Sequence, residues 1–577
     1  RRRGRITQVV NRARTQFVGT VVREQRVFGL QIAPYTPARG IRLKRKKSDR
    51  WGEGDVVVAR VLDWGTAFSP VFCEVIDRIG SGDDPRNDVQ FVAQTHQLPG
   101  EFPPDVAPEL ARLTDQFIQQ EGNRRTDLRD RRLLTIDPVG AQDHDDGISI
   151  RKLSNGWEVG VHIADVSAFV PLHSALDKEA FHRGTSVYLG DTVIPMLPEK
   201  LSAHLCSLAE GQDRLALSVL MEFDRKYRLQ DWKVLPSLVR SHGFLSYQEA
   251  QKILDGEQKS PFRNDLDVLW KLARTLFRER SEWGSIDFDI PEPRIELAES
   301  GIPHTISHRE RLNSHRIVEE CMLLANRLIA ERFGGKDGEF PFLYRIHEKP
   351  DEERMADFSR LLARLGVVPD RPELLTTPAS VRDVLLKVED SPHRNLIESL
   401  ALRSMAKARY GTVAAGHFGL AFTHYTHFTS PIRRYPDLVV HRLVKAGIRE
   451  ETYPYDVSQL ASVADWCSSR EEIALKAERD YIKRKQLRWL NEQVDEVFPG
   501  VISGVIAAGI FVQLDESLAE GLVPAATLGP EFVLDEERYC WSNRKGKVTY
   551  TLGDPVQVRV VSVDLRRQRA NFHLIAG

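Results

Sequence analysis

Hydrophobic and polar residues alternate over short stretches near the start of the chain. The runs 4–22, 28–34 and 41–64 read as short alternating segments, with Gly19 and Gly29 as interruptions. A period of two is typical of strands with one buried face, and a glycine inside such a run marks a bend or a close approach. These stretches predict a small barrel of short strands.

The same alternation returns at the other end of the chain, from Phe498 to Leu574, with Gly504 and Gly509 at expected bends. A second small barrel is therefore predicted there. This segment holds eight Lys/Arg and nine Asp/Glu, whereas the first 50 residues hold 15 Lys/Arg and two acids. Because basic surfaces attract polyanions, we expect the first barrel to bind one electrostatically and the second to contribute guidance and stacking.

Between the barrels the pattern changes to a mixture of strands and longer helices. Apolar residues recur at helical spacing in 318–333, 396–410 and 458–494, and a further helix is predicted through 110–121. No internal repeat is visible. With a polar, turn-rich linker at 80–85, the expected fold is multidomain α+β: a barrel at 1–85, a mixed α/β domain at 86–495 and a barrel at 496–577.

An acidic stretch, residues 135–150, stands near the start of the middle domain. It holds four carboxylates within ten residues, and nearby Pro138, Gly140 and Gly147 favour an irregular loop: the acids are Asp137, Asp143, Asp145 and Asp146. The segments 148–153 and 157–163 predict a hairpin that anchors this loop. A solvated acidic surface is the alternative interpretation. An EF-hand is excluded, because Gly147 and Ser154 would occupy positions that need acidic or amide ligands.

Four carboxylates so close together repel one another unless cations neutralise them. Mg²⁺ is the natural candidate because it prefers oxygen ligands and is usually held by one or two carboxylates with water and a substrate phosphate. The acidic loop therefore predicts a magnesium site that acts on a phosphate-containing substrate.

Composition adds little to this picture. The 577 residues are 28% charged and 41% hydrophobic, as expected for a soluble globular protein, and no run approaches the roughly 18 apolar residues of a membrane span. We expect no signal peptide, no membrane partner, a monomer, and a cytoplasmic or organelle-matrix location. The five cysteines are far apart and without CxxC pairing, which argues against a zinc module or a disulfide scaffold and fits a reducing compartment.

The acidic stretch opens a series of motifs that resembles the catalytic domain of the exoribonuclease II/R family. DPxxAxDxDD is followed in order by VHIADVS, GTSVY, IPMLPEKLS, LCSL, VEECMLLAN, GHFGLA and HFTSPIRRYPDLVVHR. The resemblance covers about residues 90–495, the RNB catalytic domain, and the two ends are similar to cold-shock-type and S1-type OB barrels. The GTSVY and HFTSPIRRYPDL motifs favour the RNase R branch.

The resemblance implies a processive, hydrolytic 3′→5′ exoribonuclease that degrades single-stranded RNA with a free 3′ end to 5′-nucleoside monophosphates. It implies one or two Mg²⁺ ions, for which Mn²⁺ can substitute, held by the four aspartates, with Asp145 the most directly catalytic. One ion would activate water and the other would steady the leaving 3′ oxygen, about 4 Å away. The rival hypothesis is a catalytically inactive RNB-fold RNA-binding regulator, which the presence of all four aspartates and Arg433 disfavours.

The arginine pair Arg433 and Arg434 follows Ser430, which is expected to cap a turn, and Pro436 is expected to interrupt the element that carries them. The resemblance places Arg433 over the scissile phosphate, where its planar fork offers two donors. Without the resemblance, the pair reads equally as a solvated face or a salt bridge.

The resemblance also implies RNA contacts elsewhere. Tyr188 would stack on the terminal base, Glu478 would lie near the last nucleotide, Tyr425 and His427 would line the channel, and Phe511 would be a base platform. Packing is the alternative for the aromatic residues, and a surface ion pair is the alternative for Glu478. A second aromatic wall opposite Tyr188 is not identified in the RIHEKPDEE region (345–353).

In the first barrel, Phe17, Phe28 and Trp51 are candidates for base stacking, with a role in the barrel core as the alternative, and residues 42–47 are candidates for phosphate contacts. Gly147 stands where the family more often has alanine, and we expect this to change loop stiffness more than chemistry.

Overall fold

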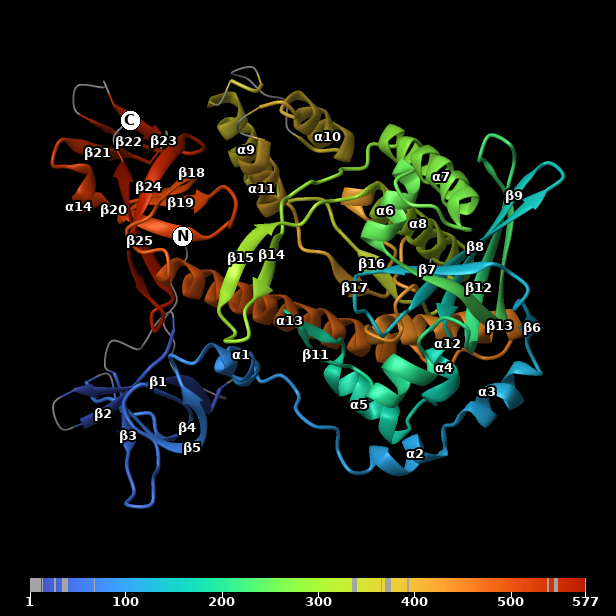
Figure 1. Cartoon of the computed structure of the whole chain (residues 1–577), viewed down its shortest axis with the longest axis horizontal. Coiled ribbons are helices and arrows are strands. Elements are labelled where there is room, and N and C mark those ends of the chain that lie inside the picture. Colours follow the sequence, from blue (N-terminus) through green and yellow to red (C-terminus); the bar gives the residue numbers. More distant parts are fainter. Residues whose placement is uncertain are drawn as a thin grey trace.

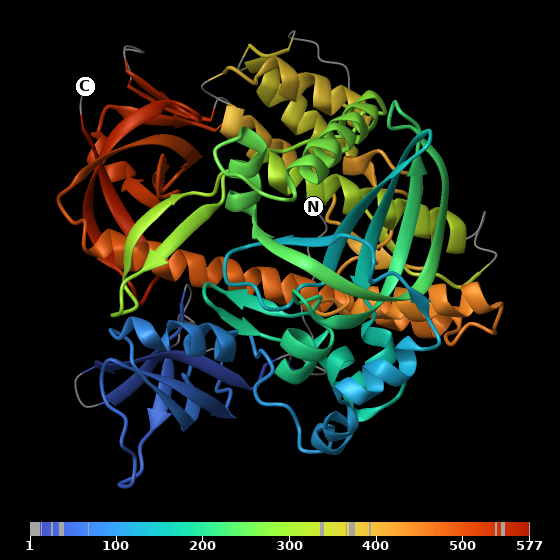
Figure 2. The same ribbon diagram turned by 45° about the vertical axis from the view of Figure 1, so that its right-hand side comes forward.

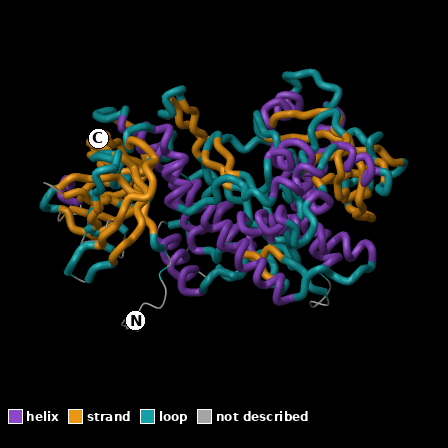
Figure 3. The backbone as a smooth tube through the Cα atoms, turned by 90° about the horizontal axis from the view of Figure 1, so that it is seen from below, coloured by secondary structure: helices purple, strands orange, loops and turns teal. Residues whose placement is uncertain are grey.

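The computed structural model describes residues 12, 14–24, 27–33, 40–66, 68–334, 340–364, 366–368, 375–391, 394–536, 539–543 and 548–575 of the chain. Two small barrels lie at one end of the molecule, and the large central domain lies at the other (Figure 1). The long helix α13 (Val457–Asn491) runs between them. Seen from below, the helices fill the middle of the molecule and the strands gather toward its two ends (Figure 3).

The N-terminal barrel is closed by five strands in the order β1-β2-β3-β5-β4. Its strands are β1 (Gln16–Glu24), β2 (Val27–Gln31), β3 (Ile41–Lys44), β4 (Asp55–Asp63) and β5 (Val71–Ser81). A side chain at Gly19 would collide with the backbone carbonyl of Gln31, so this glycine allows β1 to approach β2 closely. The predicted barrel is confirmed, and residues 4–11 of the first predicted run lie outside the described residues.

The aromatic residues of this barrel mostly pack against one another. Trp51 is only 4% exposed and belongs to the barrel core, so its interpretation as a base platform is wrong. Phe28 packs edge-on against Trp51 with ring centres 5.4 Å apart, and Phe17 packs in the same way against Trp64 at 5.9 Å. Burial of large rings is what closes so small a barrel.

The central domain is built on a six-stranded sheet in the order β12-β9-β8-β7-β13-β6, in which β12 also pairs with β13. The strands are β6 (Thr126–Asp127), β7 (Leu133–Asp137), β8 (Asp146–Leu153), β9 (Gly156–Ala164), β12 (Asp213–Phe223) and β13 (Leu229–Ser246). β8 and β9 form the predicted hairpin, with Leu153 opposite Gly156. Parallel pairing of β7 with β13 brings Ser246 beside Asp137.

Gly147 lies in β8 and not in the acidic loop. A methyl group there would stand 2.5 Å from Cδ2 of Leu133, which is fully buried on β7. The residue therefore acts through packing between β7 and β8, and the expectation of an effect on loop stiffness is wrong.

Short elements lead from the first barrel into this sheet and along its edge. They are η1 (Pro85–Asn87), α1 (Asp88–Thr95), α2 (Val106–Arg112), α3 (Asp115–Gly122), α4 (Val166–Phe169), α5 (Ala175–Arg183), β10 (Val187–Leu189), β11 (Thr192–Ile194) and η2 (Lys200–Leu205). The single helix predicted through 110–121 is wrong, because Leu113 and Thr114 are extended and Thr114 begins a new helix.

Helices cover one face of the sheet and continue toward the C-terminal barrel. They are α6 (Tyr247–Asp255), α7 (Arg263–Glu282), α8 (Asn313–Phe333), α9 (Glu352–Arg364), α10 (Pro378–Lys387), α11 (Arg394–Ser404), η3 (Phe418–Leu420) and α12 (Tyr435–Arg449). The helix predicted over 396–410 ends at Ser404, because residues 409–411 pair with another strand instead. Among the described helices, none combines the length and the apolar character needed to cross a bilayer.

Two hairpins stand between these helices. β14 (Pro293–Leu297) pairs with β15 (Pro303–His308), and β16 (Tyr344–Ile346) pairs with β17 (Arg409–Gly411). The β14–β15 hairpin reaches toward the C-terminal barrel (Figure 2), where His308 Nε2 lies 2.6 Å from the carbonyl oxygen of Asp515. The hairpin therefore joins the central domain to that barrel.

The C-terminal barrel is closed in the order β18-β19-β20-β25-β24, as predicted. Its elements are β18 (Val497–Ile506), β19 (Gly509–Leu514), β20 (Glu520–Pro524), α14 (Ala525–Leu528), β24 (Pro555–Asp564) and β25 (Arg569–Ile575), with a side sheet of β21 (Phe532–Asp535), β22 (Cys540–Asn543) and β23 (Thr549–Thr551). Leu487 and Leu490 of α13 complete its core, which fixes the barrel on the end of that helix.

The first barrel is fixed to the same helix by a buried charge cluster. Asp88, the first residue of α1, is fully buried and pairs with three cations of α13: Arg484 at 3.1 Å, Lys485 at 3.0 Å and Arg488 at 2.7 Å. A buried carboxylate needs such partners, so α1 has one favourable position on α13. Both barrels are thus held by one helix that also packs against the central domain.

Candidate active site

The acidic loop connects two strands of the central sheet. Asp137 is the last residue of β7 and Asp146 the first of β8, so the sheet fixes both ends of the loop. The loop is held further inside: the backbone N–H of His144 donates to Ser207 Oγ at 3.0 Å, and Ala164 donates to the carbonyl oxygen of Asp145 at 2.8 Å. This is an anchored loop, not a solvated surface.

Asp145 is the most enclosed of the four carboxylates, with 4% of the residue exposed. Its Oδ1 accepts a hydrogen bond from the backbone N–H of Ile432 at 2.7 Å, and its Oδ2 lies 3.5 Å from Arg433 Nε. Oδ2 is buried and makes no hydrogen bond. Burial raises the pKa of Asp145 well above its usual range, although Arg433 and the Ile432 N–H act in the opposite direction.

Arg433 is carried by a tight turn between Ser430 and the start of α12. Its carbonyl oxygen accepts from Thr185 Oγ1 at 3.0 Å and from the backbone N–H of Ser186 at 2.9 Å, and its Nη2 donates to Ser430 Oγ at 3.0 Å. Pro436 occupies the first turn of α12, where its missing N–H is tolerated, so it begins a helix and the expected interruption is wrong. The GTSVY and SPIRRY motifs thus meet through backbone bonds.

The other three carboxylates lie in different surroundings. Asp137 Oδ2 accepts from His144 Nδ1 at 2.7 Å, and Asp143 Oδ2 accepts from the Tyr188 hydroxyl at 3.4 Å. Burial raises the pKa of Asp143, and burial together with the charge of Asp137 raises the pKa of Asp146 to about 8. Burial at this site therefore disfavours the charged forms of Asp143, Asp145 and Asp146.

These features fit a hard divalent cation. Asp145 Oδ2 is buried without a hydrogen bond and the pKa values of Asp143 and Asp145 are raised, which a cation would relieve, and the ligands available to it are oxygens. Within the described residues, no group of three or more His, Cys, Asp or Glu side chains is arranged to hold a metal ion, so the structure does not bring the four aspartates together as a complete ligand set. Mg²⁺ does not require one, because it usually keeps several waters and takes phosphate oxygens as ligands.

A cleft of about 660 Å³ lies beyond this site, at the base of the β14–β15 hairpin, and Phe288, Arg309, His315 and Arg394 are among the residues that line it. His315 stacks on Tyr247 with ring centres 3.9 Å apart. Burial raises the pKa of the Tyr247 hydroxyl, and the charges of Asp146 and Asp137 contribute, so Tyr247 lies within electrostatic reach of both carboxylates.

Several predicted site residues lie deeper than expected. Arg434 donates to both carboxylate oxygens of Asp437, and Tyr425 is 6% exposed with its hydroxyl bonded to Asn326. His427 bonds to the Tyr410 hydroxyl at 2.9 Å. These contacts favour an internal role, in which Arg434 holds the turn that presents Arg433.

Two further predicted residues lie apart from the carboxylates. Glu478 stands on α13, where the surrounding protein and the charge of Glu292 raise its pKa. Phe511 is half-buried on β19 opposite Gly504, whose missing side chain leaves room for the ring. The role of Phe511 as a base platform stays a prediction.

Sequence reasoning missed four contributors to the site. His144 stands among the four aspartates and could have been noticed there. Phe288 is an aromatic residue in an otherwise acidic segment, which is a weaker signal, and the Tyr247–His315 stack has no signal in sequence. The Ile432 N–H cannot be found from side-chain types at all, because any residue except proline supplies a backbone donor.

Comparisons with known proteins agree with this architecture. The RNB domain family matches residues 125–450, the S1 RNA binding domain matches 492–574, and the cold shock domain matches 38–103. The chain is 39% identical to ribonuclease R of Aquifex aeolicus over 581 residues and 38% identical to that of Thermotoga maritima over 590, covering 99% of this chain and 82% of each relative. The structure of Mycoplasma genitalium RNase R in complex with ribose methylated single-stranded RNA superposes with a TM-score of 0.90 at 26% identity, covering 98% of this chain and 91% of that one.

Two OB-type barrels around an RNB domain with its aspartates and arginine define an RNA-degrading hydrolase, a 3′→5′ exoribonuclease. The chain belongs to the ribonuclease R family. The predicted fold class and family are confirmed, and the alternative of an inactive regulator is not favoured.

Proposed function

We propose that this exoribonuclease removes nucleotides processively from the free 3′ end of single-stranded RNA and releases 5′-nucleoside monophosphates. The observation that carries the proposal is the junction of Asp145, Ile432 and Arg433, where the buried Oδ2 of Asp145 makes no hydrogen bond and lies 3.5 Å from Arg433 Nε. A buried acid beside a fixed cation suits the transfer of a charged phosphate group. The single-stranded RNA bound by the Mycoplasma relative supports the same substrate for this chain.

In this mechanism the chain fixes the positions of two charged groups, the carboxylate of Asp145 and the guanidinium of Arg433. The Ile432 N–H holds Oδ1 of Asp145, and Oδ2, beside Arg433, would face the reacting phosphate. Arg433, fixed by Ser430 and by the bonds to its carbonyl, offers its guanidinium to the non-bridging oxygens as negative charge develops. Both groups are held before substrate arrives, so little reorganisation is needed during hydrolysis.

Asp137, Asp143, Asp145 and Asp146 would hold one or two Mg²⁺ ions, with Mn²⁺ as a substitute, together with water and substrate oxygens. When bound, the cation supplies Lewis-acid stabilisation of the phosphate. Two donors of the chain already bind these carboxylates: His144 Nδ1 contacts Oδ2 of Asp137, and the backbone N–H of Ile432 contacts Oδ1 of Asp145. Oδ1 of Asp137 and Oδ2 of Asp145 accept neither of these bonds and would be the first oxygens to bind a cation.

The terminal nucleotide would be gripped between two aromatic residues. Tyr188 reaches the carboxylate site through Asp143, and Phe288 lines the adjoining cleft, which makes Phe288 our candidate for the second wall. Stacking on aromatic rings is tolerant of base identity, as degradation of arbitrary RNA requires. Glu478 and Phe511 would contact the strand further out.

We also propose the domain limits 1–85, 86–495 and 496–577, a monomeric state and a cytoplasmic location. The break after β5 and the start of β18 support the limits, which differ from the matched family ranges by up to tens of residues.

Digestion of 5′-labelled single-stranded RNA tests the proposal. With Mg²⁺ present we expect a ladder that shortens from the 3′ end to a short limit product, with nucleoside 5′-monophosphates as the released species on thin-layer chromatography. A single-stranded DNA of the same sequence is the control substrate. Internal fragments, or nucleoside 3′-monophosphates, would contradict the proposed direction and chemistry.

A further inference from the structure

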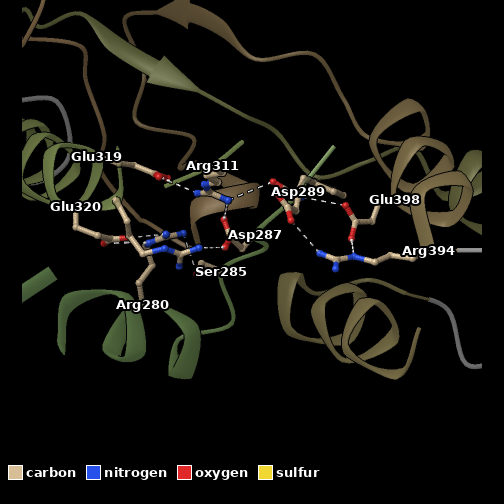
Figure 4. A network of polar contacts seen from close by, with 11 residues as sticks. Arg280, Ser285, Asp287, Asp289, Arg311, Glu319, Glu320, Arg394 and Glu398 are labelled. Carbon is tan, nitrogen blue, oxygen red and sulfur yellow. Dashed lines mark hydrogen bonds and ion pairs between the residues drawn. The ribbon is translucent and has the colours of Figure 1, made fainter. Parts of the chain in front are cut away.

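Asp287 and Asp289, the two neighbours of Phe288 in the chain, are held from different sides (Figure 4). On one side, Asp287 accepts from Arg311 Nη1 at 2.8 Å, and Arg311 Nη2 donates to Glu319 of α8 at 2.7 Å. Arg311 also donates to the carbonyl oxygen of Phe288 itself at 3.4 Å. The residue before Phe288 is thus tied to the α8 wall of the cleft.

On the other side, Asp289 is held by helix α11. Its backbone N–H donates to Glu398 Oε2 at 2.9 Å, and its Oδ2 accepts from Arg394 Nη2 at 3.3 Å. Arg394 Nε also donates to Glu398 Oε1 at 2.8 Å, so the two residues of α11 form one unit. Glu398 is only 3% exposed, and a carboxylate so deeply buried is expensive to leave without these partners.

The two anchors belong to separate hydrophobic cores. α8 packs in the main core of the central domain with Ile317, Leu324 and their neighbours, whereas α9, α10 and α11 build a smaller core of their own. Ile286 belongs to that smaller core and Phe288 packs against it. The segment that carries Phe288 therefore bridges two packing units, and a change in their relative position would move the ring.

We propose that Glu398 is a positioning residue for Phe288, and that through it the unit of α9, α10 and α11 sets the grip of the cleft on the terminal nucleotides of RNA. The inference rests on the proposed function, because it takes Phe288 as one wall of the nucleotide clamp. It goes further because it assigns a role in holding the substrate to the ion pair of Glu398 and Arg394, which is not part of the catalytic site.

A double-mutant cycle tests this role. The four proteins are the unmodified chain, Glu398→Ala, Phe288→Ala and the double variant, and the readout is equilibrium binding of a fluorescent RNA of about five nucleotides in EDTA, with limit-product length in Mg²⁺ as a second readout. We expect Glu398→Ala to weaken binding about tenfold, as loss of a buried hydrogen-bond partner implies, and to lengthen the limit product. In the Phe288→Ala background, the same change should add less than about twofold, because the ring it positions is gone.

Two further variants keep the test specific. Glu398→Gln retains an acceptor for the Asp289 N–H and should recover most of the binding. Asp357→Asn removes an exposed ion pair with Arg360 on α9 of the same unit and should change nothing. If Glu398→Ala does not fold, Arg394→Gln takes its place in the cycle.

The possible failures are distinguishable. Equal losses from Glu398→Ala in both backgrounds, or unchanged binding in the single variant, would overturn the positioning role while leaving the exonuclease intact. Unchanged binding and product length in Phe288→Ala would overturn the clamp and the inference together, with cleavage still present. Absence of any cleavage by the unmodified chain would instead contradict the proposed function.

Discussion

The backbone N–H of Ile432 donates a hydrogen bond of 2.7 Å to Oδ1 of Asp145, although 287 residues separate them along the chain. This bond joins the acidic loop to the turn that carries Arg433, and it leaves Oδ2 of Asp145 as the oxygen nearest the guanidinium. The backbone therefore fixes the position of Asp145 relative to Arg433. A change in either the acidic loop or the turn would move one of these residues away from the other.

Replacement of Arg433 should damage catalysis more than RNA binding. Arg433→Lys keeps the charge but loses the planar fork, and we expect the single-turnover cleavage rate to fall about 100- to 1,000-fold while the affinity for RNA changes less than about fivefold. Arg409→Gln, which removes an exposed ion pair with Glu348, is the matched control and should cleave normally. Equal losses of rate and affinity would place Arg433 in ground-state binding instead.

The Asp88 cluster should dominate attachment of the first barrel. Asp88→Asn leaves Arg484, Lys485 and Arg488 crowded together without their shared anion, and we expect a loss of about 3 to 5 kcal/mol in stability of that region. The midpoint of urea unfolding and proteolysis near residue 84 are the measurements. Asp84→Asn, which weakens the surface ion pair with Arg86 but can still accept from the Arg86 N–H, should leave the urea midpoint nearly unchanged.

The contribution of Asp88 to stability should decrease at low pH. Burial alone would raise the pKa of Asp88, but the three cations outweigh it and hold the pKa below its ordinary value of 3.8. An acid with a lowered folded-state pKa contributes its full stability above its unfolded-state pKa, and this is lost as pH falls through the folded-state value. The difference in urea midpoint between the unmodified protein and Asp88→Asn should thus be constant above about pH 5 and shrink below 3.8. A difference that grows toward acid would contradict the ion-pair account.

Mg²⁺ should stabilise the protein in the absence of RNA. Because the carboxylates at the site are buried and their pKa values are raised, a cation that neutralises them should raise the unfolding temperature by about 1 to 3 °C. Differential scanning fluorimetry with increasing Mg²⁺ measures this shift. Asp143→Asn should reduce it, whereas Asp191→Asn, in the exposed turn between β10 and β11, should not.

Much of the fold could be predicted because its signals are local. Alternating runs predicted both barrels, and the segments 148–153 and 157–163 predicted the β8–β9 hairpin. One error arose where a nonlocal partner decided the outcome, because the segment near Tyr410 has helical spacing but pairs with β16. Another was local, because the helix expected through 110–121 is broken by the extended residues Leu113 and Thr114.

The charged side chains of the candidate site could be predicted from the sequence. The contacts that hold these side chains in place could not. The acidic loop around Asp145 predicted a cation site from residue type, whereas the role of Arg433 followed from the family resemblance. Trp51 was misassigned because a ring in a small barrel has the same pattern whether it faces the core or RNA. Glu398 and the Ile432 N–H act through contacts that only the folded chain creates.

Asp145→Asn, compared with the unmodified protein, tests the central claim most directly. Asparagine has the same shape and still accepts from the Ile432 N–H through Oδ1, so the fold and the affinity for single-stranded RNA in EDTA should be retained. Single-turnover cleavage in Mg²⁺ should fall at least about 1,000-fold, because the anionic oxygen beside Arg433 is lost. Cleavage within about tenfold of the unmodified rate, with binding intact, would show that the reaction does not depend on the Asp145 carboxylate and would contradict this account.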